Sequence, residues 1–151
     1  MKLRIEFIPR DAEPEICVRC HALDDAVKRR CEAIEQILDD KPPIVYVKDA
    51  QEFYLPPGEV LFFETDGETV FAHTRDDMYK VSHRLYELEA LLPADFMRIS
   101  KSTVCNTAQI LSVSKNLSSS SPVQFMNTHK QVYASRFYFK DLKQKLSQRR
   151  N

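Results

Sequence analysis

Glycine is almost missing from this chain, because only Gly58 and Gly67 occur among its 151 residues. A Walker phosphate loop and a G-x-G-x-x-G dinucleotide turn each need several glycines within a few residues of one another. Glycine is required there because it lets the backbone turn tightly and approach a phosphate. Two isolated glycines form neither motif, and the sequence therefore argues against enzymes that use a nucleotide cofactor.

Long apolar runs are missing as well. The first eight residues interleave Lys2, Arg4 and Glu6 with apolar side chains, and no run approaches the roughly 18 residues that a membrane-spanning helix needs. We therefore expect no signal peptide, a cytoplasmic location and four cysteines in the thiol form. With 43% hydrophobic and 29% charged residues, the composition is that of a globular protein with one domain and a small appendage.

Acidic residues are nearly absent from the C-terminal third, although the formal net charge of the whole chain is zero. Residues 1–95 hold 12 Lys and Arg against 21 Asp and Glu, whereas residues 96–151 hold 10 Lys and Arg against Asp141 alone. An excess of nine positive charges on ordinary folding sequence suggests a surface for a polyanion. The alternative is that the acidic part neutralises the basic part in the folded protein.

Residues 1–43 predict a small β-β-α unit that ends at the stiff Pro42-Pro43 pair. Alternation of polar and apolar residues predicts strands over 2–8 and 15–21. A helix is predicted over 23–40, with Asp24 as its N-cap. Its apolar stripe consists of Val27, Cys31, Ile34 and Leu38. This stripe could cover the two strands or form a dimer contact.

Residues 44–151 predict a mainly β domain of α+β type with one long helix. Short β-rich runs predict strands at 44–48, 51–55, 60–65, 69–73, 96–100, 104–106, 110–114, 123–126 and 131–137. Asp66-Gly67 is a hairpin turn signal. The long helix is predicted to begin at a Thr74–Asp77 capping box and to end at Pro93, with an apolar stripe formed by Met78, Val81, Leu85, Leu88 and Leu92. A short basic helix over 141–148 closes the chain.

The cysteines offer two weak alternatives to a binding protein. Cys17-Val18-Arg19-Cys20-His21 spells the c-type haem attachment pattern, but strand alternation sends the two sulfurs to opposite faces, which favours structural thiols. Cys31 becomes a third metal ligand only if the strand prediction fails. Cys105 and His129 invite a thiol-imidazole dyad, but nothing in the sequence brings them together. We predict no catalytic residue, no metal site and no cofactor.

Two basic segments carry groups that bind nucleic acids. Phe96-Met97-Arg98-Ile99-Ser100-Lys101-Ser102 places two cations and two hydroxyls around a predicted strand end, and Tyr133-Ala134-Ser135-Arg136-Phe137-Tyr138 adds a second cluster. Arg and Lys donate to guanine O6 and N7, and Ser donates to phosphate oxygens. The alternative is that Arg98 and Arg136 pair with acids of the first 95 residues.

In order and spacing, residues 44–147 resemble the LytTR family of bacterial DNA-binding domains. The resemblance rests on Glu59-Val60-Leu61-Phe62-Phe63-Glu64, the helix through Leu85–Leu92, the Phe96–Asn106 segment, and Ala134-Ser135-Arg136 before a closing helix. It implies an elongated fold of about ten strands in small antiparallel sheets, with loops that enter successive major grooves. It also implies transcription regulation, usually by dimers on paired direct repeats.

The resemblance assigns DNA-contacting roles to particular residues. Lys101 is the implied base reader, Arg98 and Ser102 are implied phosphate contacts, and Ser100 stands where the family frequently has His. The family also contacts DNA with the segment that begins the closing helix. There the resemblance implies that Arg136 reads a base, with Lys140 near the DNA backbone and Tyr138 beside them. The loop Asp66–Thr69 is short and holds two acids, which disfavours contact there.

The segment before residue 44 is too short for a receiver domain, so the chain resembles the stand-alone LytTR regulators. We therefore expect a non-catalytic, sequence-specific DNA-binding regulator that binds double-stranded DNA as a homodimer, with an unidentified membrane or regulatory partner. The alternatives are a protein-interaction module with a basic face and, less favoured, a thiol enzyme that uses Cys105 and His129.

Overall fold

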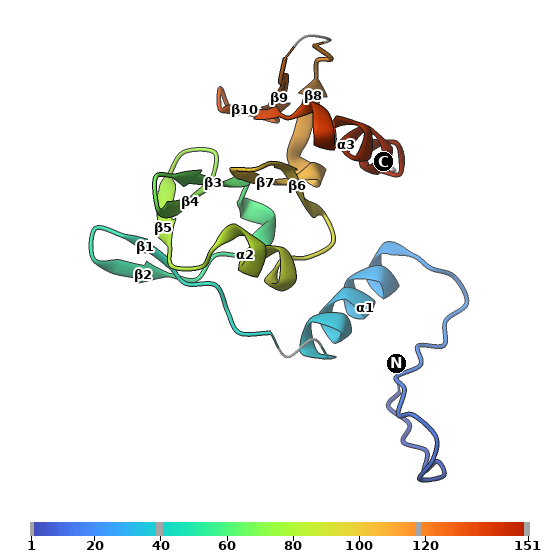
Figure 1. Ribbon diagram of the computed structural model, residues 1–151. Helices are drawn as coiled ribbons and strands as arrows, with labels where there is room; N and C mark the ends of the chain where they lie inside the picture. Colours follow the sequence, from blue (N-terminus) through green and yellow to red (C-terminus); the bar gives the residue numbers. More distant parts are fainter. Residues whose placement is uncertain (1, 39–40, 117–118, 150–151) are drawn as a thin grey trace. The chain divides into compact units, whose positions relative to one another are not determined.

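The computed structural model describes residues 2–38, 41–116 and 119–149, and it divides the chain into two compact units, Met1–Lys41 and Pro42–Asn151 (Figure 1). Within the described ranges, no helix is long and apolar enough to cross a membrane.

The first unit contains one helix, α1 (Asp25–Leu38), which confirms the predicted helix. Asp24 caps it, since its Oδ1 accepts a hydrogen bond from the backbone N–H of Val27 at 2.8 Å. The prediction of strands over 2–8 and 15–21 is wrong, because neither segment pairs with a neighbour. Among described residues 2–23, backbone bonding is confined to a turn in which Ala12 N–H donates to Pro9 C=O at 3.1 Å.

The described residues of the second unit form ten strands in two antiparallel sheets, as expected for a mainly β domain. The larger sheet has the order β2-β1-β5-β4-β3-β7-β6, and the smaller has the order β10-β9-β8. The strands are β1 (Tyr46–Lys48), β2 (Gln51–Phe53), β3 (Phe62–Asp66), β4 (Thr69–His73), β5 (Met78–Val81), β6 (Phe96–Ser100), β7 (Thr103–Asn106), β8 (Ile110–Val113), β9 (Ser121–Phe125) and β10 (Gln131–Ala134). Two helices, α2 (Leu85–Leu91) and α3 (Arg136–Ser147), and two short 3₁₀ turns, Pro57–Glu59 and Thr107–Gln109, complete the unit.

The predicted long helix over residues 74–92 is wrong in its first half, because Met78–Val81 forms β5 and only Leu85–Leu91 is helical. The residues of β5 also alternate, with Tyr79 and Val81 buried and Met78 exposed, so the strand buries its aromatic ring where a helix would expose it. Thr74 Oγ1 does accept from Asp77 N–H at 3.1 Å, but this bond closes the turn between β4 and β5.

The C-terminal helix is longer than predicted. α3 begins at Arg136 rather than Asp141, and β10 ends at Ala134 rather than at residue 137. The aromatic residues of this segment favour a strand by intrinsic propensity, but Leu142 and Leu146 one turn apart supply a stronger packing face. Arg136, Tyr138 and Lys140 therefore project from the first turns of a helix.

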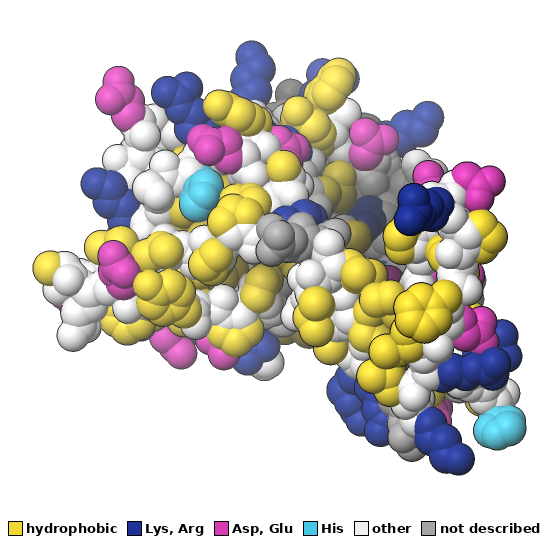
Figure 2. Space-filling model, turned by 90° about the horizontal axis from the view of Figure 1, so that it is seen from below, with side chains coloured by type: hydrophobic (Ala, Val, Ile, Leu, Met, Phe, Trp, Pro, Cys, Tyr) yellow, Lys and Arg dark blue, Asp and Glu magenta, His cyan; other side chains and the backbone are white. Residues whose placement is uncertain are grey.

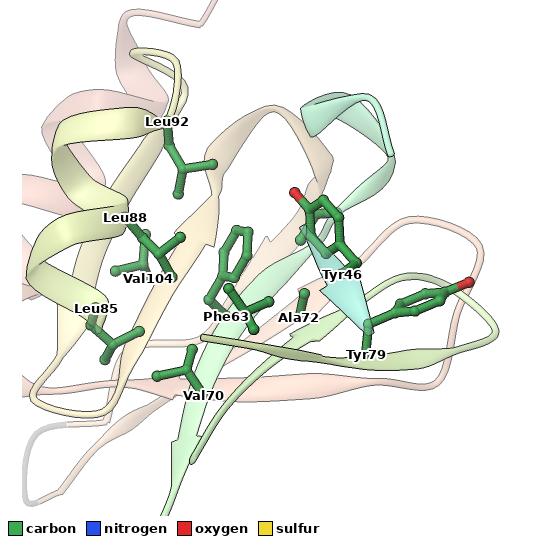
Figure 3. Packing of buried hydrophobic residues seen from close by; sticks show 11 residues of the cluster. Tyr46, Phe63, Val70, Ala72, Tyr79, Leu85, Leu88, Leu92 and Val104 are labelled. Carbon is green, nitrogen blue, oxygen red and sulfur yellow. The ribbon is translucent and has the colours of Figure 1, made fainter. Parts of the chain in front are cut away.

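Two hydrophobic clusters hold the second unit together. In the first, Leu85, Leu88 and Leu92 lie against Phe63 and Val104 of the larger sheet (Figure 3). The second cluster joins the smaller sheet and α3 to the other face of the larger sheet, through Leu61, Phe62, Ile99, Cys105, Ile110, Val123, Phe125, Val132, Ala134 and Leu142. A fully buried leucine contributes on the order of 2 kcal/mol. This packing fixes the start of α3 beside the end of β6.

Candidate nucleic-acid interface

The turn between β6 and β7 holds Ser100, Lys101 and Ser102. Ser102 N–H donates to Ser100 Oγ at 3.2 Å, and the two hydroxyl oxygens lie 3.3 Å apart. Ser102 C=O accepts from Thr65 N–H of β3 at 2.9 Å, which ties the turn to the larger sheet. Lys101 lies at the tip, exposed, and no hydrogen bond or ion pair to the described residues holds its ammonium group.

The Arg98 side chain hydrogen-bonds to two backbone carbonyl groups of this turn. Its Nε donates to Ser100 C=O at 2.9 Å, Nη2 donates to Lys101 C=O at 2.7 Å, and Nη1 pairs with Glu89 Oε2 at 3.0 Å. Only 23% of the side chain is exposed. A guanidinium has five N–H donors, of which three are engaged here. The ion pair with Glu89 is the alternative raised by the sequence, and a phosphate contact of Arg98 stays a prediction.

The start of α3 lies directly beside the end of β6. Ser135 N–H donates to Ile99 C=O at 2.8 Å, which positions the N-cap of α3 next to the strand residue that precedes Ser100. Arg136 is the first helical residue and is exposed. Lys101 and Arg136 therefore belong to two segments that are distant in sequence and meet in the fold, at a place that we call the β6–α3 junction (Ser100–Ser102 and Ser135–Phe137).

The first turn of α3 carries a cation where a helix dipole favours an anion. That turn contains Arg136 and no acidic residue. Lys140 follows at the i+4 position on the same face and is exposed, while Tyr138 is half-buried. A cationic side chain together with the N–H groups of a helix start forms a favourable site for an anionic oxygen.

The cations of the basic segment fall into two groups. Four are held by protein acceptors: Arg98 as above, Lys130 by Asp77 C=O at 2.7 Å, Lys145 by Ala94 C=O at 2.6 Å, and Arg149 by Thr107 C=O at 2.7 Å and Ile110 C=O at 2.9 Å. Within residues 96–116 and 119–149, the side chains that are exposed and have no such partner are Lys101, Lys115, Arg136, Lys140 and Lys143. The surface available to an anion is therefore smaller than the net charge suggests.

Comparison with known proteins shows the family. The family model described as the LytTr DNA-binding domain matches residues 50–147. This chain belongs to the LytTR family of DNA-binding domains. An uncharacterized HTH-type transcriptional regulator of Staphylococcus aureus strain bovine RF122 / ET3-1 is 30% identical over 147 residues, covering 97% of this chain and 99% of the relative. Its counterpart in strain MSSA476 is 29% identical with the same coverage.

A solved structure shows the same fold. The LytTr DNA-binding domain of a Bacillus cereus protein superimposes with a TM-score of 0.63 at 20% identity, covering 70% of this chain and 97% of that one. The expected LytTR fold is therefore confirmed for the second unit.

An acidic turn lies next to the basic one in this LytTR domain. Asp66, Gly67 and Glu68 connect β3 to β4 with Asp66 opposite Thr69, and Gly67 takes a left-handed conformation with φ of 63°. The bond between Thr65 N–H and Ser102 C=O places this turn beside the β6–β7 turn. Burial, and then the nearby charge of Asp66, raise the pKa of Glu64.

The structure does not bring Cys105 and His129 together as a dyad. Cys105 is fully buried in the second cluster, and burial raises the pKa of its thiol to about 12, so the nucleophilic thiolate is strongly disfavoured. His129 is exposed in the turn between β9 and β10. Among the described residues, no group of three or more His, Cys, Asp or Glu side chains is arranged to hold a metal ion.

Three features of the LytTR interface escaped the sequence predictions. Glu89 orients Arg98, and nothing in the sequence marks that pair. Lys143 joins the unpaired cations on α3; the predicted helix over 141–148 already contained it, but it was not among the predicted site residues. Phe137 is 81% exposed beside Arg136, with its ring edge-on to Tyr138 at 4.9 Å between centroids.

Proposed function

We propose that this chain is a sequence-specific transcription regulator that reads DNA through the β6–α3 junction. The observation that carries the proposal is that the segments bearing Lys101 and Arg136, two exposed and unpaired cations, are joined by the bond from Ser135 N–H to Ile99 C=O. Each can donate to guanine O6 and N7 in a major groove. Arg98 supports the reading geometry by holding the carbonyl groups of the turn.

Around this junction, other polar groups suit phosphate oxygens. Ser102 and Lys140 are exposed there, Ser100 and Tyr138 are half-buried, and Lys143 extends the same helix. Phosphate contacts fix the register of a protein on the duplex without carrying sequence information. The exposed ring of Phe137 is suited to contact a thymine methyl group next to a guanine read by Arg136.

This mode of reading differs from a helix-turn-helix, although the S. aureus relatives carry that label in their names. In the described part of this chain, strands separate α1 from α2 and α2 from α3, so no two helices follow one another through a short turn. The proposed activity is binding without catalysis. Its ligand, a bacterial chromosome, places the protein in the cytoplasm.

We further propose that two copies bind DNA together. Two copies on neighbouring half-sites would combine their affinities through a high effective concentration. Two copies also double the unpaired cations that meet phosphate.

A salt series on random-sequence duplex tests the proposal. If about four or five cations of one copy meet phosphates, the slope of log affinity against log salt is about −4 per copy. The Lys140→Ala/Lys143→Ala variant, with a matched Lys130→Ala control, should make the slope shallower by about 2, because these two cations are the ones proposed to meet phosphates. A slope near zero for the unaltered protein would contradict DNA binding and would favour a protein-interaction module.

A further inference from the structure

The segment Lys2–Ile8 exposes apolar side chains that a folded protein normally covers. Leu3, Ile5 and Phe7 are 90%, 76% and 99% exposed. Figure 2 shows hydrophobic side chains at the surface of this first unit, interleaved with Lys and Arg. Arg4 Nη2 lies 2.8 Å from Glu6 Oε1. Side chains two residues apart face the same way in a strand and not in a helix, so in an extended conformation Leu3, Ile5 and Phe7 would share one side and Arg4 and Glu6 the other.

The backbone of this segment lacks partners too. Among described residues 2–8, no backbone N–H or C=O bonds to another backbone group, and no strand is formed. A run of unpaired backbone groups with alternating side chains is a template for another strand. One added strand would supply hydrogen-bond partners for these backbone N–H and C=O groups, and its own apolar residues would extend the apolar side of the segment.

We propose that this strand comes from a second copy of the chain, paired antiparallel about a two-fold axis through Ile5. In that register Leu3 lies opposite Phe7 of the other copy, Ile5 lies opposite Ile5, and Arg4 lies opposite Glu6. The apolar side gains six side chains from the two copies, and the charged side gains two reciprocal ion pairs. The sequence complements itself in charge and in pattern, which is the requirement for an interface with two-fold symmetry.

Neighbouring pairing registers of the two strands are less favourable than the one centred on Ile5. An axis through Arg4 sets Arg4 against Arg4, and an axis through Glu6 sets Glu6 against Glu6, and like charges directly opposite each other are destabilising. A two-fold axis between Arg4 and Ile5 would set Arg4 of one copy opposite Ile5 of the other. The apolar side of one strand would then share a face with the charged side of the other. The Ile5-centred register alone among these keeps the apolar residues together and opposes unlike charges.

A two-stranded ribbon is marginal in water unless something packs on its apolar side. Helix α1 of the same unit carries an apolar stripe that is only partly covered: Val27 is buried, Cys31 and Ile34 are half-buried, and Leu38 is 58% exposed. Two copies supply two such helices for one ribbon. The proposal therefore gives a cover to two of the exposed apolar surfaces of the first unit, the Leu3-Ile5-Phe7 side and the stripe of α1.

Sedimentation of the full-length chain at a series of concentrations measures the dimer. Ile5→Lys should weaken dimerisation by on the order of a hundredfold, because two charges would meet at the axis. Arg4→Glu and Glu6→Arg should each weaken it about tenfold, and the double variant Arg4→Glu/Glu6→Arg should restore it. Retained thermal unfolding of each variant excludes loss of the fold as the cause.

A crosslink tests the register directly. With Cys17, Cys20 and Cys31 replaced by Ser, Ile5→Cys should form a covalent dimer when oxidised glutathione is added, because residues facing each other across antiparallel strands lie about 5 Å apart. Arg4→Cys is the matched control. Its copies would be separated by roughly 8 Å, beyond the reach of a disulfide.

A monomer at every concentration would overturn the proposal, as would a dimer that Ile5→Lys and the charge reversals leave unchanged, or crosslinking of Arg4→Cys but not Ile5→Cys. The proposal does not rest on DNA binding. Affinity for random-sequence duplex, measured on the same variants, reports separately on the proposed function, so the two can fail independently.

Discussion

Two junctions in the second unit are built alike and differ in whether their cations have partners within the protein. At the β6–α3 junction, a turn of the larger sheet meets the segment that follows β10, and Lys101 and Arg136 remain unpaired. At the other, which we call the β4–β9 junction, the turn Thr74–Asp77 after β4 meets the turn 127–130 after β9. There Thr128 Oγ1 donates to Arg75 C=O at 3.3 Å, and Lys130 Nζ donates to Asp77 C=O at 2.7 Å.

The comparison teaches that basic residues from one stretch of sequence have different roles: some bond within the protein, and others stay unpaired at its surface. Burial lowers the pKa of Lys130, and its Nζ lies 3.4 Å from Nδ1 of His73. Burial, and then the charge of Lys130, lower the pKa of His73 to about 4. The β4–β9 junction thus uses its cation to join two sheets, whereas the β6–α3 junction leaves its cations for a ligand.

The largest effect should come from removing the unpaired cations. Lys101→Ala and Arg136→Ala should each cost about 1–3 kcal/mol of binding free energy on the preferred site, because each loses donors to a guanine edge. The loss on scrambled DNA should be much smaller. Competition binding on a duplex selected from a random pool, against its scrambled counterpart, measures both.

Lys130→Ala is the matched control at the β4–β9 junction. It should lower the free energy of unfolding through its lost bond to Asp77 C=O and leave the ratio of specific to random affinity unchanged. Equal losses on preferred and scrambled DNA for Lys101→Ala or Arg136→Ala would make those residues phosphate contacts.

A smaller effect is expected from pH at the β4–β9 junction. An unfolded histidine has a pKa near 6.5, whereas that of folded His73 is about 4. Between these values the unfolded chain binds a proton that the folded chain does not, so stability falls as pH is lowered from about 6.5 to 4. Allowing for partial solvent screening, we expect a loss of roughly 1–2 kcal/mol.

Urea unfolding of the His73→Gln variant at pH 7 and pH 5 tests this origin. The variant should lose part of the pH dependence that the unaltered protein shows. His129→Gln, at an exposed position in the nearby turn, should keep all of it. An unchanged pH dependence in His73→Gln would assign the effect to other groups.

Strands were predicted best from segments whose hydrophobic periodicity fits a strand and does not also fit a helix. Thr69–His73 and Phe96–Ser100 match β4 and β6 residue for residue. A hairpin does join β3 to β4 as the Asp66-Gly67 signal indicates, but Asp66 pairs with Thr69, so the two turn residues are Gly67 and Glu68. Met78–Leu92 fitted two patterns, since its spacing suits a helix and Tyr79 and Val81 also alternate. Pairing with β1 and β4 decides for a strand, and that information lies in distant residues.

For the candidate interface, the sequence could predict which residue types are present. It could not predict which cations are left without a partner in the protein and can therefore contact DNA. Lys101 and Arg136 are exposed as a reading role requires. That Arg98 and Lys130 are held depends on Glu89 and on carbonyl groups brought near by the fold. Net charge counts all of these cations equally, and only tertiary contacts separate them.

The smallest effect should come from the acidic turn beside the β6–α3 junction. Asp66 and Glu68 are exposed next to the turn that carries Lys101, so their charges oppose an approaching phosphate. Asp66→Asn/Glu68→Gln should raise DNA affinity about threefold at low salt, and the gain should shrink as salt screens exposed charges. Asp49→Asn/Glu52→Gln is the matched control, because it also removes two charges, from exposed residues of the β1–β2 hairpin at the opposite edge of the sheet order. Fluorescence anisotropy at two salt concentrations measures the change, and a gain equal to that of this control would show that net charge, and not the place of these acids, sets the affinity.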